Sequence, residues 1–270
     1  MEHPAVAVVQ TCMPANQNRL LSALSPEVHA RLLPRMEKIA LRSRQTLYEA
    51  GAPLAHVWFP LSGVVSLVIE LRKSVAVEIG TVGNEGLIGI PVFLGAESSP
   101  IRLLCQVAGQ GLRMRGDAFR RALAEHAELE DVVRRYTHTM LNQTARSTAC
   151  NYVHTVRQRL CRWLLVTQDR VGSNEFHLTQ ELLGQTLAVR RPSVTIAAGL
   201  LRRDRLIDYQ RGRVRVLDRA GLEAASCQCY TALRQELDEM IGGAGAGAGA
   251  PMAPHGPEGF GLGPGRSASA

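Results

Sequence analysis

Eight arginines lie between positions 179 and 217, a stretch that contains only three acidic residues. The resulting excess of positive charge makes up most of the formal net charge of +7 of the whole chain. Guanidinium groups bind phosphate oxygens strongly, so such a stretch is typical of nucleic-acid binding. An alternative is a solvated basic surface on a protein with a general preference for arginine, because lysine occurs only at Lys38 and Lys73. The arginines are Arg190, Arg191, Arg202, Arg203, Arg205, Arg211, Arg213 and Arg215.

The same stretch predicts the elements that would position these arginines. Thr179 is a suitable N-cap for a helix over 180–187, because its hydroxyl can accept a hydrogen bond from an unpaired backbone N–H group. After a tight turn at 188–189, Pro192 suits the first turn of a second helix. Two short alternating segments then flank a Gly-containing turn at 210–213, which predicts a β-hairpin. Two helices and a hairpin in this order form a winged helix-turn-helix, whose second helix enters the DNA major groove.

The front part of the chain predicts helices followed by short strands. Residues 20–42 have apolar residues at helical spacing. Residues 46–114 instead consist of short apolar segments punctuated by glycines, which predicts an antiparallel sandwich or barrel. The interior of such a barrel could hold a small ligand.

A long helix is expected over 126–152. Apolar and small polar residues recur along it in alternate steps of four and three, which is a heptad pattern. This stripe could pack on the protein's own barrel, or it could join two copies of the chain. We favour the dimer, because helix-turn-helix proteins commonly bind paired half-sites. The expected seam comprises Leu129, Val133, Tyr136, Met140, Gln143 and Ser147.

The six cysteines do not show the spacing of a metal site. No pair has the C-x-x-C spacing, and no histidine lies at a zinc-finger offset. Cys227 and Cys229 are the closest pair, but two residues that far apart on a helix point to different sides and disfavour joint binding of an ion. We therefore expect buried, reduced thiols, no metal and no identified cofactor.

Other classes of function lack supporting motifs. No nucleophile motif, paired-carboxylate motif, phosphate loop or cupin metal motif occurs, so we expect no enzymatic activity. No apolar run approaches the ~20 residues that span a bilayer, and the N-terminus lacks the pattern of a signal peptide. We expect a cytoplasmic protein without a membrane partner. Residues 242–270, rich in Gly, Ala and Pro, are expected to form a disordered tail.

The order of helix, β-barrel, long helix and winged helix-turn-helix resembles the Crp/Fnr family of bacterial transcription regulators. The resemblance is most specific at Tyr48–Gly51, Pro60–Val65 and Leu178–Leu217. It implies an α+β fold with an N-terminal antiparallel β jelly-roll like the cyclic-nucleotide-binding fold, a long dimerisation helix and a C-terminal winged helix-turn-helix. The expected parts are an N-terminal arm (1–19), a β-roll effector domain (20–125), the dimerisation helix (126–152), the DNA-binding domain (153–241) and the tail (242–270).

The effector site departs from the cyclic-AMP branch of that family. That branch uses a Gly-Glu pair for the ribose and an Arg-Ser pair for the cyclic phosphate. Here Gly89 matches the glycine, Ile90 falls on the glutamate, and the Arg-Ser position falls near Ser98 and Ser99. Arg102 is near in sequence and is the remaining candidate for the phosphate. Because charge-assisted bonds to the phosphate would be lost, cyclic AMP is not expected to bind in the usual mode.

The family also has an oxygen-sensing branch and a heme-sensing branch. The oxygen-sensing branch uses clustered N-terminal cysteines, which this sequence lacks. The heme-sensing branch stays open through His56 or Cys105, although single residues of this kind are usually packing or surface groups.

The second helix also departs from the cyclic-AMP branch, which presents Arg-Glu-x-x-x-Arg to the groove. Arg191 matches the first arginine, whereas Pro192 and Ile196 replace the other two readers. A different operator follows, in which Arg191 would still contact a guanine. Wing arginines should bind phosphate and orient the domain. The candidate DNA-binding residues are Thr179, Gln180, Arg190, Arg191, Ser193, Thr195, Arg211 and Arg213.

The main hypothesis from sequence is a dimeric, sequence-specific transcription regulator with a non-standard small-molecule effector or none. Its partners would be double-stranded DNA, a second copy of the chain, RNA polymerase and an unidentified small molecule. The alternative is a ligand-binding regulatory protein that acts through protein contacts. The arginine groups of the second helix and the wing argue against this alternative.

Overall fold

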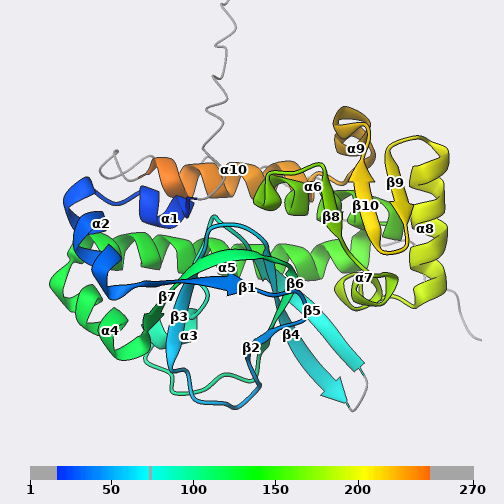
Figure 1. Ribbon diagram of the computed structural model, residues 1–270. Coiled ribbons are helices and arrows are strands. Elements are labelled where there is room, and N and C mark those ends of the chain that lie inside the picture. Colours follow the sequence, from blue (N-terminus) through cyan, green and yellow to red (C-terminus); the bar gives the residue numbers. More distant parts are fainter. Residues whose placement is uncertain (1–16, 73–74, 244–270) are drawn as a thin grey trace, which may run out of the picture.

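The computed structural model describes residues 17–72 and 75–243 of the chain (Figure 1). The expected N-terminal arm and tail lie outside the described residues, except for residues 17–19 of the arm and 242–243 of the tail. The long helix α5 (Ala127–Val153) crosses the molecule, with the strands of the N-terminal half on one side of it. The helix-turn-helix and the small sheet of the C-terminal part lie at the end of α5, whereas the last helix, α10 (Cys229–Gly242), runs alongside α5. No helix in the described part is long and apolar enough to cross a membrane.

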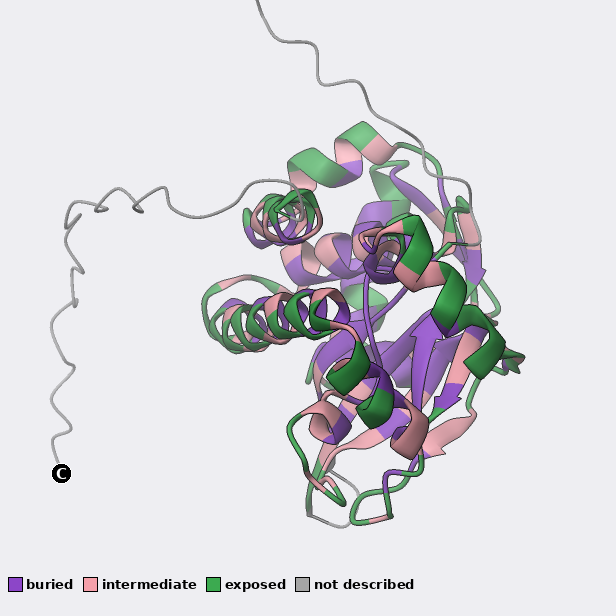
Figure 2. Cartoon of the chain, turned by 90° about the vertical axis from the view of Figure 1, so that its left-hand side faces the viewer, coloured by how far each residue is buried: buried purple, intermediate pink, exposed green. Residues whose placement is uncertain are grey.

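The N-terminal half contains two antiparallel sheets, with strand orders β1-β7-β3 and β2-β6-β4-β5. Phe59 of one sheet and Val65 of the other belong to the same buried core, so the two sheets enclose a common interior. Buried residues gather in these strands and on the inner sides of the helices (Figure 2). The strands are β1 (Glu37–Leu41), β2 (Thr46–Tyr48), β3 (His56–Pro60), β4 (Val64–Arg72), β5 (Val75–Val82), β6 (Arg102–Val107) and β7 (Gly109–Arg115).

The first helical segment is shorter than its spacing suggests. It consists of α1 (Arg19–Ser22), α2 (Pro26–Leu32) and a 3₁₀ turn at Leu33–Arg35. The expectation of helix up to residue 42 is wrong from Glu37 onward, where strand β1 begins. Pro34 lacks a backbone donor and disfavours continuation of the helix. The following residues pair instead with β7, a strand that is distant in sequence.

Helix α5 packs its heptad stripe against its own chain. Each residue of that stripe is buried, from 0% exposure for Val133 to 9% for Ser147. Helices α1 and α10 (Cys229–Gly242) and strand β5 contact α5. The predicted dimer seam is therefore wrong as a partner-binding surface, because these side chains are already buried within the chain's own fold. The six residues withdrawn from the predicted seam are Leu129, Val133, Tyr136, Met140, Gln143 and Ser147.

The C-terminal part begins with α6 (Val156–Val171), which starts in a capping box between Thr155 and Gln158 and ends at Gly172 in a left-handed conformation. Its sheet has the order β8-β10-β9, so the predicted hairpin gains a third strand that the sequence pattern did not indicate. The remaining elements are α3 (Ile90–Phe93), α4 (Gly116–Glu125), β8 (Glu175–His177), α7 (Gln180–Thr186), α8 (Arg191–Arg203), β9 (Ile207–Gln210), β10 (Arg213–Val216) and α9 (Arg219–Ala225).

Candidate nucleic-acid interface and interior cavity

Helices α7 and α8 form the predicted two-helix unit. The Thr179 hydroxyl accepts a hydrogen bond from the backbone N–H of Leu182 at 3.3 Å, as its N-cap role requires. Pro192 lies in the first turn of α8, where its missing N–H leaves no hydrogen bond unmade. The inner face of α8 is buried at Val194, Ala197, Ala198 and Leu201, as the spacing predicted. The opposite face is therefore free to meet a ligand.

Three of the predicted DNA-binding residues lie together where α7 and α8 begin. The Gln180 Oε1 atom accepts hydrogen bonds from Arg191 Nε at 3.2 Å and from the Thr195 hydroxyl at 3.3 Å. Gln180, Arg191 and Arg211 line one surface hollow of about 490 Å³. No carboxylate of the described chain forms an ion pair with Arg190, Arg191 or Arg211. Their charge is therefore available to an anionic partner.

Arg44 also lines this hollow, and sequence reasoning missed it. It lies in the turn between β1 and β2, far from the helix-turn-helix in sequence, and it is exposed. Only the packing of the β-roll against the C-terminal part brings Arg44 near Gln180 and Arg191. No local signal in the sequence could have indicated it.

The remaining candidates on α8 differ in accessibility. Arg190 and Thr195 are exposed, whereas Ser193 is half-buried. Ile196, which replaces an arginine of the cyclic-AMP branch, is 66% exposed. An exposed isoleucine in the middle of this helix could contact the methyl group of a thymine.

The wing turns tightly at Arg211 and Gly212, which both have positive φ angles of 48° and 78°. This backbone fits a two-residue hairpin loop, and Gly212 adopts it without strain. Arg213 is less free than the sequence indicated, because β8 brings Glu175 beside it and the two form an ion pair. Arg215 contacts the same carboxylate at 2.9 Å. Among the wing arginines, Arg211 therefore carries the more available charge.

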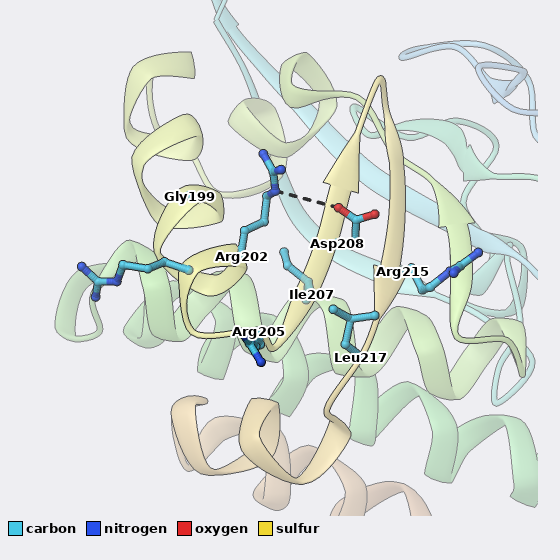
Figure 3. Close-up of a pocket in the computed structure, with 8 residues that line it drawn as sticks. Gly199, Arg202, Arg205, Ile207, Asp208, Arg215 and Leu217 are labelled. Atoms are coloured by element: carbon cyan, nitrogen blue, oxygen red, sulfur yellow. Dashed lines mark ion pairs between the residues drawn. The ribbon is translucent and has the colours of Figure 1, made fainter.

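A second basic hollow of about 590 Å³ lies at the other end of α8 (Figure 3). Arg202, Arg205 and Arg215 line it, together with the single acid Asp208. The Arg202 Nε atom lies 3.9 Å from the Asp208 carboxylate. The eight arginines thus do not form one patch, because Arg191 and Arg211 line the first hollow, whereas Arg202, Arg203, Arg205 and Arg215 line the second.

The interior of the β-roll contains a cavity of about 350 Å³. Gly89, Ile90 and Ser99 line it as predicted, but Ser98 and Arg102 are not among its lining residues. Arg102 pairs instead with Glu70 at 3.3 Å. The other walls come from apolar strand residues and from the α5 residues Thr137, Met140, Leu141 and Thr144. The described lining contains no charged side chain, so the expected roles of Ser98 and Arg102 in this cavity are wrong.

Neither heme-ligand candidate lines the cavity. Cys105 is fully buried, and burial raises the pKa of its thiol to about 12. His56 lies on β3, where burial and the nearby charges of Arg113 and Arg115 lower its pKa.

Comparison with known proteins agrees with this geometry. Residues 158–225 match the family model of the Crp-like helix-turn-helix domain. The chain has a Crp-like DNA-binding domain. No curated protein matched the sequence significantly.

The fold of the chain is similar to that of several solved regulators. The chain is similar to FixK2 from Bradyrhizobium japonicum, with 13% identity, a TM-score of 0.61, and coverage of 71% of this chain and 98% of that one. It is similar to TTHB099, a CRP-family regulator from Thermus thermophilus, with 20% identity, a TM-score of 0.58, and coverage of 70% and 96%. The c-di-GMP-responsive regulator CLP from Xanthomonas campestris gives 15% identity, a TM-score of 0.56, and coverage of 71% and 99%. The predicted α+β Crp/Fnr fold is confirmed.

The Crp-like domain packs directly on the β-roll through buried polar groups. Glu78 of β5 accepts hydrogen bonds from Ser66 at 2.7 Å, Gln106 at 2.9 Å and, across the interface, Thr186 of α7 at 3.1 Å. Burial raises the pKa of Glu78, whereas the hydrogen bonds from Ser66 and Thr186 and the charge of Arg162 oppose the rise. The helix-turn-helix is thus connected to the β-roll through a titratable group.

The described cysteines of the chain are buried and free, as expected. The expectation that Cys227 and Cys229 point apart is wrong, however. Cys227 lies between α9 and α10, and Cys229 is the first residue of α10, so helical spacing does not apply to the pair. The sulfurs of Cys227 and Cys229 lie beside the sulfur of Cys150 and the imidazole of His154.

Proposed function

We propose that the chain is a homodimeric transcription regulator that binds a specific DNA sequence through α8 and the wing. The observation that carries this proposal is the group of exposed, unpaired arginines around the start of α8 within a Crp-like domain. Arg190, Arg191 and Arg211 form no ion pair in the described chain, although the exposed Glu181 lines the same hollow as Arg191 and Arg211. Such a regulator would act in the cytoplasm on DNA and RNA polymerase, and no enzymatic activity is proposed.

Within this proposal, base reading falls to Arg191 and Ile196. Arg191 can donate two hydrogen bonds to a guanine, and Gln180 holds its Nε at the groove-facing end of the helix. Ile196 lies five residues further along α8, is exposed, and would contact a thymine methyl. Thr179 and Arg211 would contact phosphates, which set the orientation of the domain on the duplex. Arg44 adds a phosphate contact from the β-roll.

The dimer contact is proposed on the exposed side of α5. Leu141, Ala145, Thr148 and Tyr152 are exposed and follow one another in steps of four, three and four, which is a heptad spacing. Leu141 is 66% exposed and Tyr152 is 93% exposed, which is unusual for side chains of this size. A second copy of α5 in the same register would bury both. This stripe replaces the buried one that the sequence alone favoured.

The effector is proposed to be a mainly apolar small molecule rather than a cyclic nucleotide bound in the usual mode. A cyclic phosphate needs a positive partner, and the described cavity lining has none. Its polar groups are limited to hydroxyls, among them Ser99 and Thr144. Because Leu141 lines the cavity and also belongs to the exposed stripe of α5, a bound ligand would contact the proposed dimer interface.

The experiment that tests the proposal is footprinting of the purified full chain on promoter DNA from its source genome. Symmetric protection of two half-sites about one helical turn apart supports it. The affinity for DNA should fall steeply as the salt concentration is raised. Binding releases counterions from the DNA phosphates, and this release is less favourable at high salt. Retained dimerisation without binding to any DNA would instead favour a regulator that acts through protein contacts.

A further inference from the structure

Four potential metal ligands converge at the far end of α5. The Sγ atoms of Cys150, Cys227 and Cys229 and a ring nitrogen of His154 all lie within 4.8 Å of one another. Cys150 and Cys227 approach to 3.6 Å between sulfurs, and Cys229 Sγ lies 3.8 Å from His154 Nδ1. The three cysteines are buried and the histidine is half-buried. Such a group is a donor set that soft or borderline metals prefer.

The local structure explains why these side chains meet. Cys150 belongs to the last turn of α5, and His154 follows one turn later as the C-cap, where its backbone N–H bonds to the Cys150 carbonyl. Cys227 lies in the short link after α9, and Cys229 begins α10. The link turns sharply enough that the Tyr230 N–H bonds to the Cys227 carbonyl at 3.0 Å. Two separate chain segments thus each contribute a pair of ligands.

The spacing fits one tetrahedral ion. Zinc lies about 2.3 Å from thiolate sulfur and about 2.0 Å from imidazole nitrogen, so its tetrahedral ligands lie roughly 3.5–3.8 Å apart. Two contacts of the group, the 3.6 Å between the Cys150 and Cys227 sulfurs and the 3.8 Å between Cys229 Sγ and His154 Nδ1, agree with these separations. The remaining pairs, all within 4.8 Å, require small side-chain adjustments only.

The surroundings suit the charge of such a centre. Three thiolates, a neutral imidazole and a divalent ion together carry one net negative charge. Arg159 is 5% exposed, and its Nε and Nη2 atoms have no hydrogen-bond partner in the described part of the chain. Arg159 lies close enough to Cys150 and Cys227 to interact electrostatically with both. Arg162 also interacts electrostatically with these two cysteines. A buried guanidinium beside the ligands would offset the negative charge of the loaded site.

We propose that Cys150, His154, Cys227 and Cys229 form a Cys₃His site for a single divalent ion of the zinc type. On binding, each thiol gives its proton to solvent and its sulfur donates an electron pair to the ion. The site joins the end of α5 to the segment after the wing, beside the point where α5 passes into α6. The ion therefore holds the Crp-like domain in place relative to the central helix.

The first experiment measures metal content in the full chain purified without chelators. One zinc per chain is expected. Replacement by Co²⁺ should give the intense visible bands of a tetrahedral cobalt–thiolate centre. Cys229→Ser should lose the stoichiometric metal, whereas Cys105→Ser, which changes a buried thiol of the β-roll outside the group, should keep it. The cobalt spectrum of the unmodified chain stays decisive if a variant fails to fold.

Three results would overturn the proposal. One is a chain that binds neither Zn²⁺ nor Co²⁺ stoichiometrically while its thiols are reduced. Another is an intramolecular Cys150–Cys227 disulfide detected by mass spectrometry in protein purified under anaerobic conditions. The third is iron with acid-labile sulfide, which would mean a cluster rather than one ion. None of these results bears on DNA binding by α8, so failure of the metal site leaves the proposed function standing.

A second measurement tests the connecting role of the ion. Chelation should lower the thermal unfolding temperature of the unmodified chain and leave that of Cys229→Ser unchanged, because only the former loses a bound ligand. An equal shift in both proteins would show that the chelator acts elsewhere and would contradict the role of this site.

Discussion

Arg170 of α6 and Glu85 of the β5–α3 loop form an ion pair in which Nη2 and Oε1 lie 2.6 Å apart, with both side chains only 3% exposed. Arg170 Nη2 also donates to the Thr81 carbonyl at 3.0 Å, and the Gly83 N–H donates to Glu85. The same loop continues to Leu87, Ile88 and Gly89, which line the interior cavity. One loop therefore contacts both the cavity and the first helix of the Crp-like domain. Ligand binding that moves this loop would displace α6.

Replacing Arg170 with Met should lower the free energy of unfolding by about 3–5 kcal/mol, because Glu85 would remain buried without its counter-charge. Urea denaturation measures this loss. The double variant Arg170→Met with Glu85→Leu should recover much of it. Arg31→Ala removes an exposed ion pair with Glu27 and should change stability by less than about 1 kcal/mol. Equal effects of Arg170→Met and Arg31→Ala would contradict the importance of the buried pair.

Arg191→Ala should weaken binding to the preferred DNA site by about 1–3 kcal/mol and relax the preference at one base pair, because it removes a bidentate contact to guanine. Competition binding with single-base variants of the site measures both effects. Arg203→Ala is a suitable control, since Arg203 lies at the other end of α8 and pairs with Asp204. An unchanged sequence preference in the Arg191 variant would remove this residue from base reading.

Arg211→Ala should weaken binding to all DNA sequences alike and reduce the slope of affinity against salt by about one, because it removes one phosphate contact. Arg213→Ala should have a smaller effect, since Arg213 already pairs with Glu175. Fluorescence anisotropy over a range of salt concentrations measures the slopes. The assignment fails if Arg213 contributes as much as Arg211 or if the loss depends on sequence.

Leu141→Asp should weaken dimerisation and leave the fold intact, because Leu141 is 66% exposed in the single chain. Met140→Asp should instead destabilise the protein itself, because Met140 is 6% exposed and belongs to the core. Sedimentation measures the association, and thermal unfolding measures the stability. A fully dimeric Leu141→Asp protein would move the dimer contact away from this stripe.

The stability that Glu78 contributes should decrease as pH rises. Burial raises its pKa in the folded chain, so it is protonated there at pH values where the unfolded chain has already ionised, above about 4.3. The contribution is complete below that value and is lost as pH rises through the folded pKa. The free energy of unfolding of the native chain should therefore fall relative to Glu78→Gln over this window. Glu49→Gln, at an exposed position, should follow the native chain. A constant difference between the native chain and Glu78→Gln would contradict the raised pKa.

Local patterns predicted the helix-turn-helix well because its signals depend on neighbouring residues. The Thr179 cap, the position of Pro192 and the buried face of α8 all follow from spacing within one or two turns. The strands β3 to β7 were also indicated by short apolar segments between glycines. Strand β1 was missed, because its pairing with β7 joins residues more than sixty positions apart and overrides the local helical spacing.

The heptad of α5 illustrates a different limit. Spacing showed that one side of the helix is buried, but it could not distinguish burial by the barrel from burial by a second copy. The two cases place the same residue types at the same positions. Only the packing of α5 against the sheet and α10 separated them, and it moved the proposed dimer contact to the stripe that contains Leu141 and Tyr152.

The sequence by itself determined the Crp-like domain and its arginine-rich helix, because caps, turns and amphipathic spacing are properties of short segments. Tertiary structure alone decided which arginines remain unpaired, since Glu175 reaches Arg213 from a separate strand. It also brought Arg44 to the interface and gathered Cys150, His154, Cys227 and Cys229 from two segments more than seventy residues apart. Contacts of this kind depend on how distant segments pack, and no spacing within one segment encodes them.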